Sequence, residues 1–575
     1  MYCFSKHKNS TFYFPGQEIF LAGRGTLSWK NRDVALQQEK GRALCVIGSF
    51  LFAFCILAGK FFSVYSGASV VVAEKENKII SLDIKMERAD ITDRNGILLA
   101  TSLPSVDLYA DVSKIKNAET IAAALVQTLP DLSYKTVLKK LKSKKKFVYL
   151  KRQLTPTEQY EINRLGFPAL NFENNEIRVY PQGALFSHLI GRTNIDNKGI
   201  SGLEKTLNKK LSEEKENIRL SLDVGVQNSI RTILKQTVDE HQAQGAAAVL
   251  MNAKTAQVVA MVSLPDFDPN KSVGAQNAAQ FNSASLGVYE LGSVMKLFNA
   301  AIGLETKKFR VSDTFDASEP LVLVNHKITD EPSLRRTLSL PEILIHSSNI
   351  GSAQIALGVG AEKQRQYLEK FGFFDPLRIA LPEKGQPIYP SKWRESNTAT
   401  VSYGYGLSVT PLHVTAAAAA LVNGGKYAVP NFFADVNEEK IPAKRIISKK
   451  TSDIMRAMMR MVVLKGTGRR ANVAGYEVGG KTGSARKVVK GKYAEDNVRT
   501  SFLSAFPMDN PEYVLMVMID SPKKSKATHF QNNAAWNAVP AAEKIISAVA
   551  PQLGITPRPY EPSQSAPYVR RILAQ

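Results

Sequence analysis

Three short motifs contain residues that could carry out acyl chemistry without a cofactor, and the first is Ser293-Val294-Met295-Lys296. Residues three apart on a helix share one face, so the hydroxyl and the amine can meet. A serine becomes a good nucleophile when a base takes its proton, and a lysine with a lowered pKa can be that base. Taken alone the pair is a weak signal, because chance produces about two in a chain of this length.

The second motif is Ser347-Ser348-Asn349, which follows a helix-like segment. Ser347 offers a hydroxyl that can relay a proton, and Asn349 offers an amide with a donor and an acceptor, which suits a peptide backbone. Taken alone the motif is equally typical of a helix cap or turn.

The third motif is Gly479-Gly480-Lys481-Thr482-Gly483-Ser484, preceded by the strand-like residues 476–478. Lys481 supplies a positive charge and Thr482 and Ser484 supply hydroxyls, a combination that suits a substrate carboxylate. Glycines on a strand, such as Gly483, allow another backbone to approach closely. Backbone N–H groups at Ser293 and Ser484 are candidates for an oxyanion hole.

Residues 475–482 also match the phosphate-loop pattern GxxxxGK[ST]. That pattern requires a strand before the loop and a helix after it. Here the strand-like residues fall inside the loop and β-like residues follow it, so a nucleotide site is the weaker interpretation.

The elements that must position these motifs are strands at both ends of a helix-rich region. Residues 246–251 and 257–262 form two apolar runs separated by a short turn, which predicts a hairpin. Residues 500–506 and 513–519 predict a second strand pair, and residues 411–422 predict a helix. Strands that enclose helices in this way favour an α+β domain with an antiparallel sheet.

The order S-x-x-K, S-x-N, K-T-G is the signature of active-serine penicillin-recognising enzymes. The chain resembles the class B penicillin-binding proteins, the monofunctional D,D-transpeptidases, and is most similar to their septal-division (FtsI) type. The resemblance extends from about residue 80 to 550, and its further landmarks are residues 88–96, 178–181, His188, Gly191, 202–204, 264–270, 404–406 and 410–412.

The resemblance implies a role for each motif residue. Ser293 attacks the D-alanyl-D-alanine carbonyl and Lys296 accepts its proton, while Ser347 relays a proton with help from Lys481. Asn349 holds the donor peptide. The donor's terminal carboxylate is bound by the strand motif, that is, by Thr482, Gly483 and Ser484 with Lys481.

Two positions depart from the family pattern. Leu291 stands where a proline is expected, and Ser484 replaces the commoner threonine. Neither change removes a reacting group, so we expect catalysis to be retained.

Composition limits the alternatives. The net charge is +23, which favours contact with anionic surfaces. The basic run at residues 135–152 is compatible with a nucleic-acid patch, but a solvated helix face is the better interpretation, and no nucleic-acid partner is expected. All three cysteines precede residue 60, so the main domain has neither a disulfide nor a cysteine zinc site. We expect no metal or other cofactor.

Residues 43–65 form an almost uncharged apolar stretch of the length needed to cross a bilayer. The excess of Lys and Arg before it places the N-terminus in the cytoplasm and the rest of the chain outside the inner membrane, in the periplasm. A buried core helix and a cleaved signal peptide are the alternatives, and a charged region of over forty residues argues against the latter.

The expected organisation is a cytoplasmic segment (1–42), a transmembrane helix (43–65), a mixed α/β pedestal module of the dimerisation type (66–220), a transpeptidase domain (221–550) and a flexible tail (551–575). In the last domain we expect an antiparallel sheet with helices on both faces. The expected partners are peptidoglycan stem peptides, as D-Ala-D-Ala donor and amine acceptor, β-lactams, a membrane-embedded glycan polymerase and division proteins. The alternatives are an elongation-type transpeptidase, a D,D-carboxypeptidase, a β-lactamase and a non-enzymatic scaffold.

Overall fold

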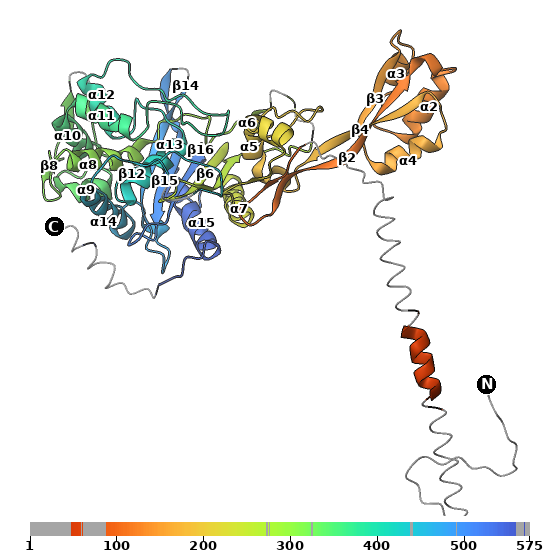
Figure 1. Cartoon of the computed structure of the whole chain (residues 1–575). Helices are drawn as coiled ribbons and strands as arrows, with labels where there is room; N and C mark the ends of the chain where they lie inside the picture. Colours follow the sequence, from red (N-terminus) through yellow and green to blue (C-terminus); the bar gives the residue numbers. More distant parts are fainter. Residues whose placement is uncertain are drawn as a thin grey trace, which may run out of the picture. The chain divides into compact units, whose positions relative to one another are not determined.

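The computed structural model divides the chain into two units, Met1–Lys85 and Met86–Gln575 (Figure 1). It describes residues 88–558 apart from 272–273, 275–276, 324–325, 437–440 and 490, together with residues 46, 48–58, 60 and 569. The expected cytoplasmic segment (1–42) and most of the tail therefore lie outside the described residues.

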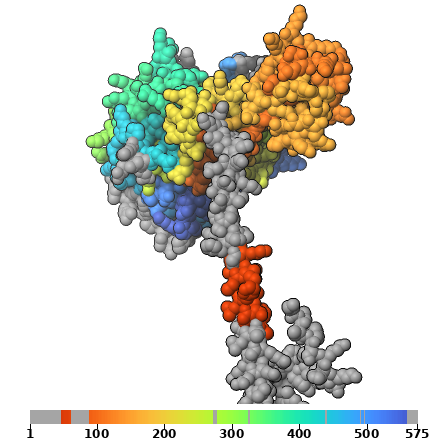
Figure 2. All heavy atoms as spheres, turned by 45° about the vertical axis from the view of Figure 1, so that its right-hand side comes forward, coloured from red at the N-terminus to blue at the C-terminus, as the bar shows by residue number. Residues whose placement is uncertain are grey.

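The described part of the first unit is a helix. Residues 46, 48–58 and 60 are helical, and their apolar side chains, among them Phe50, Phe52 and Phe54, are exposed (Figure 2, red). Within the described residues, no helix combines the length and the apolar character that crossing a bilayer requires. The rest of the expected transmembrane stretch at 43–65 lies outside the described residues.

The second unit begins with a mixed α/β module built on a five-stranded sheet. Its strands are β1 (Ile91–Thr92), β2 (Leu98–Asp111), β3 (Phe147–Leu154), β4 (Leu170–Val179) and β5 (Ile218–Arg219), and β1 pairs with β5 in parallel. Helices α2 (Ala118–Thr128), α3 (Tyr134–Leu141) and α4 (Pro156–Arg164) pack on it around their own apolar core. The short helices α5 (Ser187–Ile190) and α6 (Gly202–Thr206) follow β4.

The basic run at residues 135–152 is not one helix face as expected. It forms α3, a turn and then β3, where Lys151 pairs with Glu158 at 2.7 Å and Arg152 with Asp107 at 2.6 Å. The run is not a single helix because its residues from Phe147 onward pair with β2. Most of its lysines are exposed, so the solvated part of the expectation holds.

This module contains a cluster of buried charged side chains. Glu204 lies between two arginines, Arg88 (Nε to Oε2, 2.7 Å) and Arg178 (Nε to Oε1, 2.7 Å), and all three side chains are at most 1% exposed. The N–H of Gly202 in the same helix, α6, donates to the Glu383 carboxylate of the following domain at 3.2 Å. Three landmarks of the family resemblance, residues 88, 178 and 204, therefore form one network.

The following domain is built on a five-stranded antiparallel sheet in the order β14-β15-β16-β6-β7. Both expected strand pairs are present, the hairpin β6 (Gly245–Asn252) and β7 (Val258–Leu264), and the pair β15 (Lys492–Phe506) and β16 (Tyr513–Asp520). Strand β14 (Gly479–Val489) pairs with β15. The order places the third motif at the edge of the sheet.

Both faces of this sheet are covered, because the side chains of a strand point alternately to its two sides. Residues 247, 249 and 251 of β6 join the core that contains α8 (Met295–Glu305) and α13 (Pro411–Val422). Residues 246, 248 and 250 join the core that contains α7 (Val224–Glu240) and α15 (Ala538–Gln552), which pack together in Figure 1. The expected sheet with helices on both faces is therefore present.

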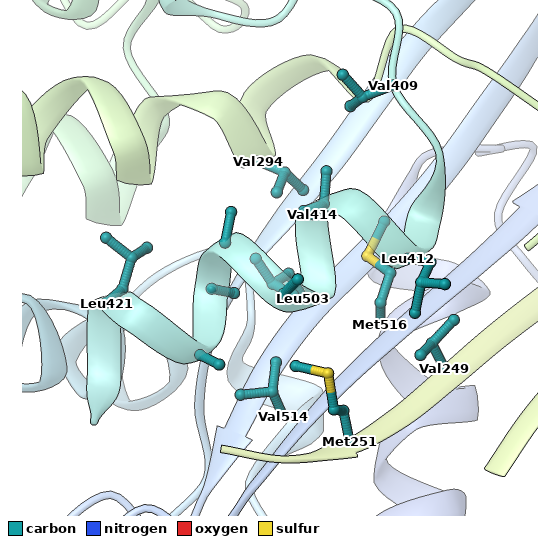
Figure 3. Packing of buried hydrophobic residues seen from close by; sticks show 14 of the residues in the cluster. Val249, Met251, Val294, Val409, Leu412, Val414, Leu421, Leu503, Val514 and Met516 are labelled. Atoms are coloured by element: carbon teal, nitrogen blue, oxygen red, sulfur yellow. The ribbon is translucent and has the colours of Figure 1, made fainter. Parts of the chain in front are cut away.

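Helix α13 is the central helix of the first core. It has the predicted bounds, begins with Pro411 at its first turn and is capped by Thr410, whose hydroxyl accepts from the His413 N–H. Small alanines let it lie close to the sheet, where Leu412 lies beside Met516 and Val249, while Val414 lies beside Val294 (Figure 3). The same cluster contains Val294, which joins the nucleophile turn to the core.

The remaining elements of this domain surround that core. They are α9 (Leu340–His346), α10 (Asn349–Val359), α11 (Ala361–Lys370), α12 (Glu395–Ser402), α14 (Lys449–Lys465) and the short strand pairs β8–β11 (Thr314–Asp316, Thr337–Ser339), β9–β10 (Leu321–Leu323, His326–Ile328) and β12–β13 (Lys426–Tyr427, Lys444–Arg445).

Residues 476–478, which were expected to be a strand, are not one. Glu477 has a φ of 42°, in the left-handed region, and the Val478 carbonyl accepts from Arg460 Nη1 at 2.8 Å rather than from a neighbouring strand. The strand therefore begins only at Gly479.

Candidate active site

Ser293 lies in a single 3-10 turn, Gly292–Val294, which leads directly into α8. The backbone of this turn packs directly against the backbone of β14. A Cβ on Gly292, whose φ is 57°, would lie 2.5 Å from the Ser484 carbonyl oxygen, and one on Gly483 would lie 2.3 Å from the Leu291 carbonyl oxygen. Only glycines permit this approach, which places the first and third motifs side by side.

Lys296 lies one turn further along and is 1% exposed. Its Nζ lies 3.0 Å from Ser293 Oγ, 3.2 Å from Ser347 Oγ and 2.7 Å from Asn349 Oδ1, and it also contacts the Ser347 carbonyl oxygen. The structure thus brings the first and second motifs together around one nitrogen.

Lys296 is placed to act as a base. Burial lowers its pKa well below the ordinary value and the charge of Lys481 lowers it further, while Asp330 opposes the shift. A neutral amine has two N–H donors and one lone pair. The two carbonyl-type oxygens, from Ser347 and Asn349, match the donors, which leaves the lone pair for the proton of a serine hydroxyl.

Ser347 lies between the two lysines. It ends α9 in the left-handed conformation, with φ 63°, an unfavourable backbone state for serine that points its hydroxyl into the site. Its Oγ lies 2.9 Å from Lys481 Nζ. Burial lowers the pKa of Lys481 to about 7, so this residue also titrates close to neutrality.

Asp330 is a residue that the motifs did not indicate. Its side chain is 8% exposed and accepts hydrogen bonds from Ser348 Oγ at 2.6 Å and from the Ile350 N–H at 3.1 Å. It also accepts from the Asn349 N–H. A carboxylate at the start of α10 is favourable because free N–H groups point toward it. Asp330 therefore holds the second motif in place.

The third motif lies on β14 as expected, with Lys481 fully buried and Thr482 8% exposed. Thr482 Oγ1 lies 2.7 Å from Thr467 Oγ1, a contact that the motif did not indicate. Ser484 is exposed, and its Oγ accepts from the Ala534 N–H at 3.2 Å. Residues 481–484 thus present a positive charge and hydroxyls along one strand edge.

The phosphate-loop interpretation is wrong. Lys481 and Thr482 lie inside a strand that continues to Val489, whereas a phosphate loop requires a helix at that point.

A partly buried carboxylate was also missed, that of Glu290, three residues before the nucleophile. Its Oε1 accepts from the Gly406 N–H at 2.6 Å and from the Tyr493 hydroxyl at 3.1 Å. The segment 404–406 was noted only as a family landmark. The structure explains it, since the Gly404 carbonyl also accepts from the Gly292 N–H at 3.3 Å.

Comparison with known protein families identifies both domains. Residues 83–247 match the "Penicillin-binding Protein dimerisation domain", and residues 246–542 match the "Penicillin binding protein transpeptidase domain". The order of the two matches is that of the module and the sheet domain described above.

Curated relatives agree over most of the chain. The "Probable peptidoglycan D,D-transpeptidase FtsI" of Caulobacter vibrioides is 33% identical, covering 92% of this chain and 91% of that protein. The stage V sporulation protein D of Bacillus subtilis is 30% identical (86% and 82%), and the peptidoglycan D,D-transpeptidase FtsI of Escherichia coli is 29% identical (84% and 88%).

Among solved structures, the penicillin-binding protein 3 of Mycobacterium tuberculosis complexed with aztreonam matches with a TM-score of 0.65 and 24% identity, covering 82% of this chain and 97% of that chain. At this identity the match supports the fold. With both family matches and the curated relatives, the chain belongs to the class B penicillin-binding proteins, the peptidoglycan D,D-transpeptidases.

Proposed function

We propose that this chain cross-links peptidoglycan at the division septum, with Ser293 as the nucleophile. The septal role is supported by the FtsI names of its relatives. The elongation-type transpeptidase remains the alternative within the class. The observation that carries the proposed chemistry is the 3.0 Å distance between Ser293 Oγ and the nitrogen of a lysine whose burial favours the neutral form.

In the first half-reaction Ser293 Oγ attacks the carbonyl carbon of the penultimate D-alanine of the donor stem peptide, and Lys296 takes its proton. Ser347, which contacts both lysines, passes a proton to the leaving nitrogen as the C–N bond breaks. The last D-alanine departs and an ester remains on Ser293. Asn349 binds the donor backbone, and Lys481, Thr482, Gly483 and Ser484 bind its terminal carboxylate.

In the second half-reaction an amine of a neighbouring stem, as the free base, attacks the ester carbon. The new C–N bond forms, the bond to Ser293 Oγ breaks, and one amine proton ends on that oxygen. The backbone N–H groups of Ser293 and Ser484 stabilise the oxyanion in both steps. The close approach of Gly292 to Ser484 supports this assignment.

We also propose that residues 43–65 form a transmembrane helix, with residues 1–42 in the cytoplasm and the catalytic domain in the periplasm. The apolar helix within 46–60 and the basic residues before it support this topology. The proposed boundaries are 66–220 for the pedestal, 221–550 for the transpeptidase domain and 551–575 for the tail. A membrane-embedded polymerase supplies the glycan strands, and division proteins recruit the chain.

Intact-mass spectrometry of the detergent-solubilised full chain after brief exposure to benzylpenicillin tests the proposal, with Ser293→Ala beside the wild type. An adduct on the wild type alone supports an acyl-serine enzyme with slow deacylation. Hydrolysed drug without an adduct would instead indicate a β-lactamase, and intact drug without an adduct would indicate a non-enzymatic scaffold.

A further inference from the structure

The Glu290 carboxylate forms no ion pair in the part of the chain that the structure describes. Both of its hydrogen-bond donors, the Gly406 N–H and the Tyr493 hydroxyl, reach Oε1. Among the described residues, Glu290 forms no ion pair with a Lys, Arg or His nitrogen, and no protein donor reaches its Oε2. Glu290 is partly buried, and this burial raises the pKa of its carboxyl. A desolvated, unpaired carboxylate is costly, so a ligand cation is its natural partner.

The nearby Arg499 does not fill this role. Its guanidinium donates to Asp520 Oδ2 at 3.1 Å and stacks over the Tyr289 ring at 4.1 Å. Asp520 in turn binds Lys487 at 2.7 Å. Arg499 is close enough for its charge to oppose the rise in the Glu290 pKa, but its hydrogen bond and its ring contact go to Asp520 and Tyr289 rather than to the Glu290 carboxylate.

Aromatic rings flank the carboxylate. The rings of Tyr405 and Tyr493 meet edge to face with centroids 5.3 Å apart, and Tyr403 packs against Tyr405 at 6.0 Å. The faces of such rings attract cations, most strongly where water is partly excluded. A carboxylate beside tyrosine rings is a combination of groups that can bind an ammonium group.

The site lies along the strand that we assign to the donor peptide. The Tyr405 hydroxyl accepts from the backbone N–H of Arg486 at 3.3 Å, and Arg486 is two residues beyond Ser484 on β14. Two strand residues span about 7 Å. Glu290 and its tyrosines therefore lie close to the nucleophile, on the far side of Ser484 from Lys481.

We propose that Glu290, with Tyr405 and Tyr493, binds the ammonium group of the acceptor stem peptide. This inference rests on the proposed transpeptidase function. Each substrate carries a charge beside its reacting group: the donor has a carboxylate on the D-alanine that leaves, and the acceptor has an amine that is protonated until it attacks as the free base. Lys481 and Glu290, which lie on opposite sides of Ser484, carry the matching opposite charges, Lys481 for the donor and Glu290 for the acceptor.

The test measures how the acyl-enzyme partitions. The full chain is acylated with a benzoyl-D-alanyl thioester in the presence of a tripeptide that ends in L-lysine, and the amide product is compared with the hydrolysed acid. Glu290→Gln is isosteric and keeps an oxygen for Gly406 and Tyr493 but loses the charge. Asp496→Asn removes an exposed carboxylate from β15, the strand that carries Tyr493, and serves as the matched control.

We expect Glu290→Gln to lower the ratio of amide to acid about tenfold, the value of one charge-assisted hydrogen bond, and to raise the KM for the tripeptide. Asp496→Asn should leave the ratio unchanged. Added salt should lower the wild-type ratio and have little effect on that of Glu290→Gln.

An unchanged ratio in Glu290→Gln would overturn the proposal. So would an equal loss of thioester acylation and of amide formation, because Glu290 would then only position the nucleophile turn. Failure of the wild type to form an acyl adduct with benzylpenicillin would instead refute the proposed function. Tyr493→Phe, which keeps the ring and loses the hydroxyl, should lower the ratio less than Glu290→Gln does.

Discussion

Ser347 Oγ lies 2.9 Å from Lys481 Nζ, and the same oxygen lies 3.2 Å from Lys296 Nζ. One hydroxyl thus joins two buried amines whose pKa values are both lowered. The proposed mechanism gives the two lysines different tasks. In it Lys296 acts as a base, which requires the neutral amine, whereas Lys481 attracts a carboxylate, which requires the charged form.

The first prediction is a bell-shaped pH profile for acylation by benzylpenicillin. On the acid side the rate falls because Lys296 becomes protonated. On the alkaline side it falls as Lys481 loses its proton, at about pH 7 in the free enzyme. Lys481→Arg keeps the charge at all working pH values, so the alkaline decline should disappear even if the maximum rate is lower. An alkaline decline that survives in Lys481→Arg would contradict the assignment.

The second prediction concerns stability. The folded-state pKa of Lys481 is about 7, below the ordinary lysine value of 10.5 that applies to the unfolded chain. Between these pH values the unfolded chain binds more protons, so stability rises with pH. Lys481→Met removes the burial cost of the charge. Its Tm should exceed that of the wild type by at least about 2 °C at pH 6, and the difference should vanish near pH 10. Lys526→Met, at an exposed lysine, should not change Tm, and an equal gain there would refute the explanation.

The third prediction concerns Asp330. Asp330→Asn keeps an oxygen for the N–H groups of Asn349 and Ile350 but removes the charge and the acceptor for the Ser348 hydroxyl, so the turn that carries Ser347 and Asn349 should loosen. We expect a loss of about 1–3 kcal/mol in the free energy of unfolding and at least about a tenfold slower acylation. Asp316→Asn, an exposed carboxylate that caps Ser318, is the control and should leave acylation unchanged. Denaturant titration and stopped-flow acylation measure the two effects.

The fourth prediction compares two glycines of one segment. Gly404 and Gly406 have φ values of 94° and 82°, so an alanine is strained at either position. A Cβ on Gly404 would lie 2.0 Å from the Gly292 carbonyl oxygen, whereas at Gly406 the nearest atom is 3.7 Å away. Gly404→Ala should therefore displace the nucleophile turn and slow acylation about a hundredfold, while Gly406→Ala should cost mainly stability. Equal acylation rates in the two variants would show that the close contact has no catalytic importance.

The parts of the fold that could be predicted are those that depend on the pattern of neighbouring residues in the sequence. Helix α13 was placed correctly because a capping threonine, a first-turn proline and an alanine run agree with one another. The hairpin of β6 and β7 was visible as two apolar runs of strand length. The three motifs could be assembled into one site because their order is itself a signal.

The remaining features depend on contacts between distant residues. Asp330 lies 18 residues before Ser348 in the sequence, and Glu290 meets Tyr493 from 203 residues away. The periodicity of a short sequence segment cannot predict contacts between residues so far apart. Residues 476–478 show the opposite error, because their composition is typical of a strand but they do not form one. Glu477 has a left-handed backbone conformation, and Arg460 donates a hydrogen bond to the Val478 carbonyl.

The Arg88–Glu204–Arg178 cluster has a mechanical consequence. Arg88 is the first described residue of the second unit, and its guanidinium is bound to Glu204 in the helix whose Gly202 N–H meets Glu383 of the transpeptidase domain. A pull on the preceding chain, which we assign to the membrane anchor, therefore passes through Arg88 into α6 and on to the catalytic domain. The side chains of α2, α3 and α4 take no part in this route, because they pack in a separate apolar core.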